Sequence, residues 1–173
     1  MNKNTKNLIL CALMAGLIAV CSQIQIPLPY VPINAALLAV HMTAIILKPK
    51  YAILTVIVYI GLGFIGLPVF ANFAGGAQII FGPTGGFIIG YLLDVIIISV
   101  AVNMFDNSTK TISIYATLGT VACYALGTIW FMGVTQMHLN AALVYCVYPF
   151  IPGDILKIIL AVLLSKRLKF INK

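Results

Sequence analysis

Two charged residues stand one helical turn apart inside the last apolar stretch of the chain. Asp154 and Lys157 lie within residues 144–164, and the whole chain has only three acidic residues. Counting back from Lys166 at about 1.5 Å per residue places Lys157 roughly 13 Å inside a hydrocarbon core about 30 Å thick. A charge at this depth costs several kcal/mol unless it is paired or faces water. The pair therefore predicts a binding site for a small polar ligand; a purely structural salt bridge is the alternative.

Asp94 is a second anomaly, because it lies within the apolar residues 86–104 with no basic residue within one turn. It could act as a proton relay, pair with Lys157 from across the bundle, or be protonated in an apolar site, and we favour the last two. His41 and His138 have no carboxylate or cysteine at useful spacing, so we expect them to be hydrogen-bonding residues. The four cysteines form no metal-ligand pattern and are interpreted as buried apolar residues.

Composition predicts a membrane protein. The chain is 62% hydrophobic and 8% charged, whereas soluble domains carry about 25% charged residues. The net charge of +7 comes from cations at links and termini, and nucleic-acid binding would need them on one face. The sequence contains no hydrolase triad, metal cluster or nucleotide loop, so we expect neither an enzyme nor a cofactor.

The apolar runs predict a single all-α domain over residues 1–173 with six transmembrane helices. The predicted spans are 7–23, 34–48, 51–66, 86–104, 112–132 and 144–165. Links on one side carry the charges, while links 22–33, 67–85 and 133–143 carry none, which predicts that both termini are cytoplasmic. The uncharged links are apolar but rich in proline and glycine. We expect them to fold over an outward-facing ligand cavity; plain loops packed on the bundle are the alternative.

Further residues are candidates by position. Asn34, Asn72, Gln78 and Thr84 are polar groups near the predicted cavity, and Tyr148 is close enough to Asp154 to line it. In the first span, small residues lie on adjacent faces, where they permit close helix approach within the protein or to a partner. These small residues are Ala12, Ala15, Gly16 and Ala19.

Four motifs occur in order along the chain: Ile26–Tyr30, Gly66–Phe70, Phe81–Gly86 and Pro152-Gly153-Asp154-x-x-Lys157. With them, essentially the whole chain resembles the BioY family, the biotin-binding S components of energy-coupling-factor (ECF) transporters. The resemblance implies high-affinity capture of biotin at the cell membrane, with a transmembrane scaffold subunit and two ATP-binding subunits as partners.

The resemblance also implies residue roles. Asp154 and Lys157 would contact the vitamin. From their positions, we expect the same site to include Asn34, Asn72, Gly75, Gln78, Thr84 and Tyr148. The small residues of the first span would form the docking surface for the scaffold.

Alternatives remain open on the residues alone. A proton-coupled or solitary permease for another vitamin-like molecule could use Asp94, and a membrane interaction protein could use the ion pair structurally. The orientation of biotin is also open, because Lys157 could bind either the ureido oxygen or the carboxylate tail.

Overall fold

The computed structural model describes residues 3–105 and 108–168, and it is almost entirely helical. Asp106 and residues 169–173, which entered the topology prediction, lie outside the described residues. The long helices are α1 (Lys3–Gln23), α2 (Ala36–Ile46), α3 (Pro49–Phe64), α5 (Gly85–Met104), α6 (Thr109–Thr135) and α8 (Ile151–Leu168). Shorter elements are η1 (Ala71–Phe73), α4 (Ala77–Ile80) and α7 (Leu139–Cys146). Strands β1 (Gln25–Ile26) and β2 (Ile33–Asn34) form an antiparallel hairpin that pairs Gln25 with Asn34.

Three described helices, α1, α5 and α6, are long and apolar enough to cross a membrane. The pair α7 and α8, bent by 48° at a short break, would make a fourth span. Helices α2 and α3 are apolar but shorter. This helical, apolar architecture is that of a membrane protein. Each of the six predicted spans overlaps one long helix, while the number of crossings stays a prediction. The last span, predicted as continuous over 144–165, is interrupted by the break between α7 and α8, and most of α7 lies in the predicted link 133–143.

Local sequence sets several helix ends. Pro49 occupies the first turn of α3, where its missing N–H would have no partner. Ser108 caps α6 by accepting the Thr111 N–H at 3.2 Å. At the other end of α6, Gln136 adopts a left-handed conformation with φ 58°, a common way to end a helix.

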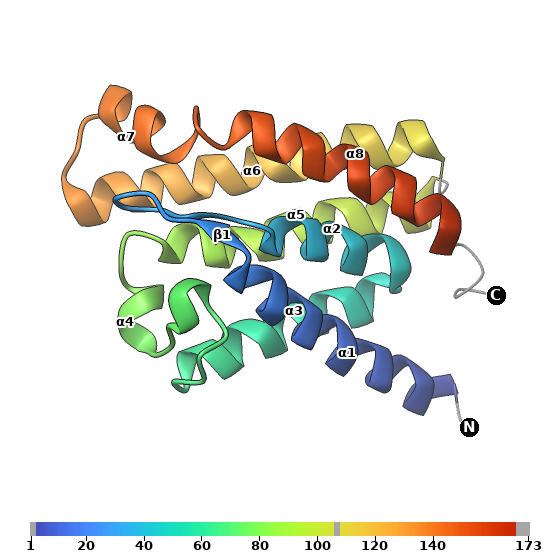
Figure 1. Cartoon of the computed structure of the whole chain (residues 1–173). Helices are drawn as coiled ribbons and strands as arrows, with labels where there is room; N and C mark the ends of the chain where they lie inside the picture. Colours follow the sequence, from blue (N-terminus) through green and yellow to red (C-terminus); the bar gives the residue numbers. More distant parts are fainter. Residues whose placement is uncertain (1–2, 106–107, 169–173) are drawn as a thin grey trace.

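Helix α2 is the centre of the bundle. Ten of its 11 residues are buried, and it packs against α1, α3, α5 and α8. Beside it, α5 and α6 approach closely because glycines lie between them: a methyl group on Gly90 would collide with Cys123, and one on Gly127 would collide with the Phe87 ring. The hairpin, η1, α4 and α7 gather at the end of the bundle opposite the start of α1 and the end of α8 (Figure 1).

Candidate ligand-binding site

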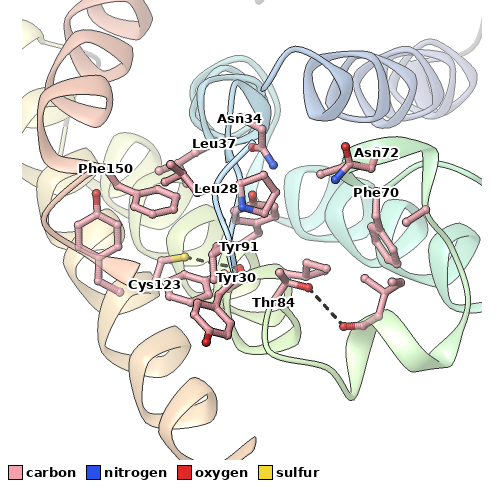
Figure 2. A pocket seen from close by; sticks show the side chains of 18 of the residues that line it. Leu28, Tyr30, Asn34, Leu37, Phe70, Asn72, Thr84, Tyr91, Cys123 and Phe150 are labelled. Atoms are coloured by element: carbon pink, nitrogen blue, oxygen red, sulfur yellow. Dashed lines mark hydrogen bonds between the residues drawn. The ribbon is translucent and has the colours of Figure 1, made fainter. Parts of the chain in front are cut away.

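A cavity of about 280 Å³ lies at the hairpin end of the bundle, close to the lower limit of about 300 Å³ for small-molecule pockets. The hairpin segment 28–34, the η1 segment and the helices α2, α3, α5, α6 and α8 all contribute to its lining. Its walls are largely aromatic and aliphatic, and polar side chains converge on it from several elements (Figure 2). This combination is typical of sites that bind a small organic molecule.

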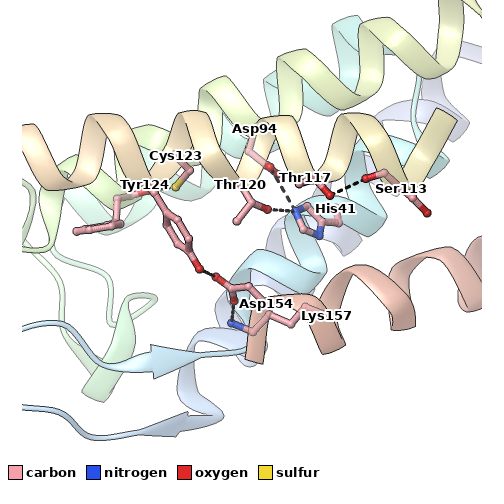
Figure 3. A network of polar contacts seen from close by, with 10 residues as sticks. His41, Asp94, Ser113, Thr117, Thr120, Cys123, Tyr124, Asp154 and Lys157 are labelled. Carbon is pink, nitrogen blue, oxygen red and sulfur yellow. Dashed lines mark hydrogen bonds and ion pairs between the residues drawn. The ribbon is translucent and has the colours of Figure 1, made fainter. Parts of the chain in front are cut away.

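The Asp154 carboxylate anchors one part of the cavity wall. Lys157 Nζ lies 2.6 Å from Asp154 Oδ1, and the Tyr124 hydroxyl donates a hydrogen bond to Oδ2 (Figure 3). Asp154 is 3% exposed and lies in the first turn of α8, where the helix dipole favours a negative charge. Asp154 and Lys157 thus lie on one face of α8, as their spacing predicts, and the pair they form borders the cavity. That the pair binds a ligand stays a prediction.

Neutral polar groups line other parts of the cavity. Asn34 Oδ1 accepts the Ala36 N–H at 3.0 Å, which fixes the turn from β2 into α2. Asn72 accepts a hydrogen bond from the Gln25 amide and has φ 61°, a left-handed conformation that asparagine tolerates better than most residues. Thr84 precedes α5. The structure thus brings Asn34, Asn72 and Thr84 together with the ion pair, although they are far apart in sequence.

Aromatic residues shape the rest of the cavity. Tyr30 makes edge contacts with Phe131 and Tyr145, with ring centroids 5.7 and 5.0 Å apart. Tyr59 is hydrogen-bonded to Ser22 at 2.8 Å. Among the residues that line the cavity, sequence reasoning assigned no binding role to Tyr30, Tyr59 or, above all, Tyr124. A usable signal existed: a tyrosine deep in a span, away from the interfacial belt, needs a buried partner for its hydroxyl.

A glutamine on α1 holds the η1 segment against the bundle. Gln23 Nε2 donates to the Phe70 carbonyl at 3.0 Å, and Gln23 Oε1 accepts the Phe73 N–H at 2.9 Å. Because Asn72 lies between these two anchor points, Gln23 fixes the backbone that presents the asparagine to the cavity.

Three predicted site residues do not line the cavity. Gly75 packs against the backbone of Gly66 and Leu67, and Gln78 is exposed and donates to the Gly75 carbonyl at 2.8 Å. Tyr148 is 57% exposed. The break between α7 and α8 places Phe150, rather than Tyr148, in the cavity wall (Figure 2).

Asp94 pairs with His41 and not, as one prediction had it, with Lys157. His41 Nε2 lies 3.3 Å from Asp94 Oδ1, and both side chains are fully buried. Thr120 Oγ1 lies 3.4 Å from the same histidine nitrogen (Figure 3). The prediction that His41 is a hydrogen-bonding residue is confirmed, and neither His41 nor Asp94 borders the cavity.

The part of the chain that the structure describes contains no group of three or more His, Cys, Asp or Glu residues that could hold a metal.

The predicted docking residues of α1 do not share one surface. Ala12 and Gly16 are exposed, and nothing lies within 4 Å of a methyl group placed on Gly16. Ala15 is 4% exposed and belongs to the core, so it cannot contact a partner without unpacking the bundle. Ala19 is half-buried and packs against that core. Only Ala12 and Gly16 thus remain available on the outer face.

These features define a class: helical membrane proteins that enclose a small cavity bordered by a buried ion pair. Within it, the chain matches the sequence profile of the BioY family over residues 1–173 and belongs to that family. "Biotin transporter BioY2" of Lactococcus lactis subsp. cremoris is 35% identical over 168 residues, 96% of this chain and 92% of the relative. "Biotin transporter BioY" of Thermotoga maritima is 34% identical over 169 residues, 95% and 96% of the two chains.

The same fold occurs in a solved structure. The crystal structure of "the S-component for biotin from an ECF-type ABC transporter" superposes with a TM-score of 0.88 at 28% sequence identity. The match covers 98% of this chain and 94% of that one. The names of these relatives are those of transport proteins rather than enzymes.

Proposed function

We propose that this protein captures biotin at the outer face of the cell membrane as the S component of an ECF-type transporter. The observation that carries the proposal is the Asp154–Lys157–Tyr124 cluster, which borders a small cavity in a chain of the BioY family. Uptake would then depend on a scaffold subunit and two ATP-binding subunits, and ATP hydrolysis would belong to those partners.

The chemistry of the cluster suits the ureido group of biotin. A carboxylate accepts the ureido N–H, and an ammonium donates to the ureido oxygen, so Asp154 and Lys157 complement both kinds of group at once. A ligand carboxylate in the same place would face the negative charge of Asp154. We therefore place the ureido ring at the ion pair and the carboxylate tail toward Asn34, Asn72 and Thr84. The aromatic wall would contact the apolar ring and chain.

The proposed topology has six spans, with both termini in the cytoplasm and the cavity facing outward. The start of α1, the end of α8 and the α2–α3 link lie at the end of the bundle away from the cavity (Figure 1). Lys48 belongs to this link, and Lys50 lies in the first turn of α3 beside it. Lys110 at the start of α6 belongs to the same end. The hairpin end carries no Lys or Arg in its loops. This asymmetry fits the preference of cytoplasmic loops for basic residues.

Docking of the scaffold would use the exposed small residues Ala12 and Gly16 of α1. Small residues let two helix backbones approach closely, which is how transmembrane helices associate without a hydrophobic driving force.

Ligand titration tests the binding proposal. Protein purified in mild detergent is titrated with biotin, with dethiobiotin, which keeps the ureido group, and with lipoate, which lacks it. We expect sub-micromolar biotin binding, with affinities in the order biotin, dethiobiotin, lipoate. Absence of sub-micromolar biotin binding would refute the proposal.

Purification of the tagged chain from its native membrane tests the assembly, and we expect the scaffold and both ATP-binding subunits to accompany it.

A further inference from the structure

The cavity has an unusual charge balance for a site that receives an anionic ligand. Among the described residues that line it, Asp154 and Lys157 are the acid and the base. They are paired at 2.6 Å, so their charges cancel. The described lining therefore offers no cation free to neutralise a ligand carboxylate.

The groups proposed to receive the ligand tail are neutral donors. Asn34 Oδ1 is engaged by the Ala36 N–H, and Asn72 Oδ1 is engaged by the Gln25 amide. The amide nitrogen of Asn34 also donates a hydrogen bond to the Tyr91 hydroxyl. Because an amide nitrogen carries two N–H groups, Asn34 and Asn72 each keep a donor that can serve any oxygen acceptor of a ligand. A carboxylate oxygen and the carbonyl oxygen of an amide or ester can each accept such a bond. Only a charged donor would favour the carboxylate strongly.

Several residues that line the cavity also reach the surface of the protein. Asn72 and Pro29 are exposed, and Tyr30 is 39% exposed. Asp154, at the other part of the wall, is 3% exposed. With the ureido ring at the buried ion pair, we place the carboxyl end of the ligand toward these exposed residues, where an added group can extend into solvent.

We propose that this protein binds neutral carboxyl derivatives of biotin, namely its amides and esters, about as tightly as it binds biotin. The ligand class includes the amide formed with a lysine side chain. The inference rests on the proposed function, because it assumes that the ureido ring lies at Asp154 and Lys157. Recognition then depends on the ureido ring and the apolar chain, and the negative charge of the tail contributes little.

The first test uses the purified full-length chain without substitutions. Biotin, biotinamide and biotin methyl ester are titrated in parallel, each at low and at high salt. We expect the three dissociation constants to agree within about threefold, with little change with salt. Tight biotin binding with both derivatives weaker by more than about thirtyfold would overturn this inference and leave the proposed function intact. Failure of all three ligands would overturn both.

A substitution at the ion pair separates the two orientations of the ligand. In Lys157→Met, we expect biotin and biotinamide to weaken by the same factor, because Lys157 serves the ureido oxygen that both ligands share. If biotin weakens and biotinamide does not, Lys157 holds the carboxylate and the inference is wrong.

A second substitution supplies the missing cation. Thr84→Lys should raise the preference for biotin over biotinamide by about tenfold, because the tail then gains a charge-assisted bond. Thr84→Gln is the matched control, with a long neutral donor and an expected ratio close to that of the unsubstituted protein. An unchanged ratio in a folded Thr84→Lys protein that binds biotin would place the carboxylate elsewhere and overturn the inference.

Discussion

Replacing Asp154 by Asn removes the one carboxylate among the described lining residues of the cavity and almost preserves its shape. The carboxylate now accepts from Lys157 and Tyr124, and in the proposed complex it also accepts the ureido N–H. Hydrogen bonds to charged groups contribute about 1.5–3 kcal/mol each, and a neutral acceptor keeps roughly half of that. The substitution also leaves Lys157, 13% exposed, without its partner. We therefore expect biotin binding to weaken by about 2 kcal/mol or more, roughly thirtyfold.

Calorimetric titration with biotin in one detergent and one buffer measures this loss. Lys157→Ala should weaken binding by a similar amount, since it removes the other half of the same pair. Asp94→Asn is the matched control: the same chemical change at an equally buried acid outside the cavity should leave the dissociation constant within about twofold. Unsubstituted affinity in both Asp154→Asn and Lys157→Ala would refute the reasoning and identify the pair as a structural salt bridge.

Three further substitutions test the rest of the molecule. His41→Leu leaves Asp94 fully buried without its partner and should lower stability in detergent by about 3 kcal/mol; thermal unfolding should show most of the loss recovered when Asp94→Leu is added, and equal melting of the single and double variants would contradict this. Gly127→Val should cost about 1–3 kcal/mol by overpacking the α5–α6 contact, while Gly133→Ala, at an open position, should not destabilise in the same melting assay. Gly16→Leu should leave biotin titrations unchanged and abolish co-purification of the partner subunits; a complete complex would argue against the docking face.

The helical architecture and the ion pair could be predicted from sequence because both depend on local spacing. Apolar runs between proline- and glycine-rich links located α1, α2, α3, α5 and α6 to within about four residues at each end. The run 144–165 did not reveal the break between α7 and α8, so the start of α8 was placed seven residues too early. Residues three apart in a helix share one face, so the contact between Asp154 and Lys157 follows from their spacing alone. Asn34, Asn72 and Thr84 could be predicted as cavity residues because polar side chains within apolar loops are expected to face a cavity rather than lipid.

The partners across the bundle could not be predicted in the same way. His41 and Asp94 are 53 residues apart, and no pattern in either helix shows which face meets the other. The same cause explains why Tyr124 was overlooked as a residue of the cavity wall and why Tyr148 was assigned to it instead. The cavity wall depends on the rotation of α6 and on the 48° bend between α7 and α8, and sequence spacing determines neither.

The cavity exists because the central helix is short. An 11-residue helix is about 16 Å long, roughly half of a hydrocarbon core about 30 Å thick. Helix α2 is buried on almost every side and begins only at Ala36. The hairpin and η1, rather than a longer α2, therefore occupy the space on the N-terminal side of its first turn. Asn34 and Leu37 border the cavity from this end of α2, and their position follows from the late start of the helix. Irregular backbone at this depth is stable only where protein or a cavity satisfies its polar groups. The apolar, proline-rich hairpin thus replaces a helix at this end of the bundle, and its irregular backbone lies against protein and the cavity rather than against lipid.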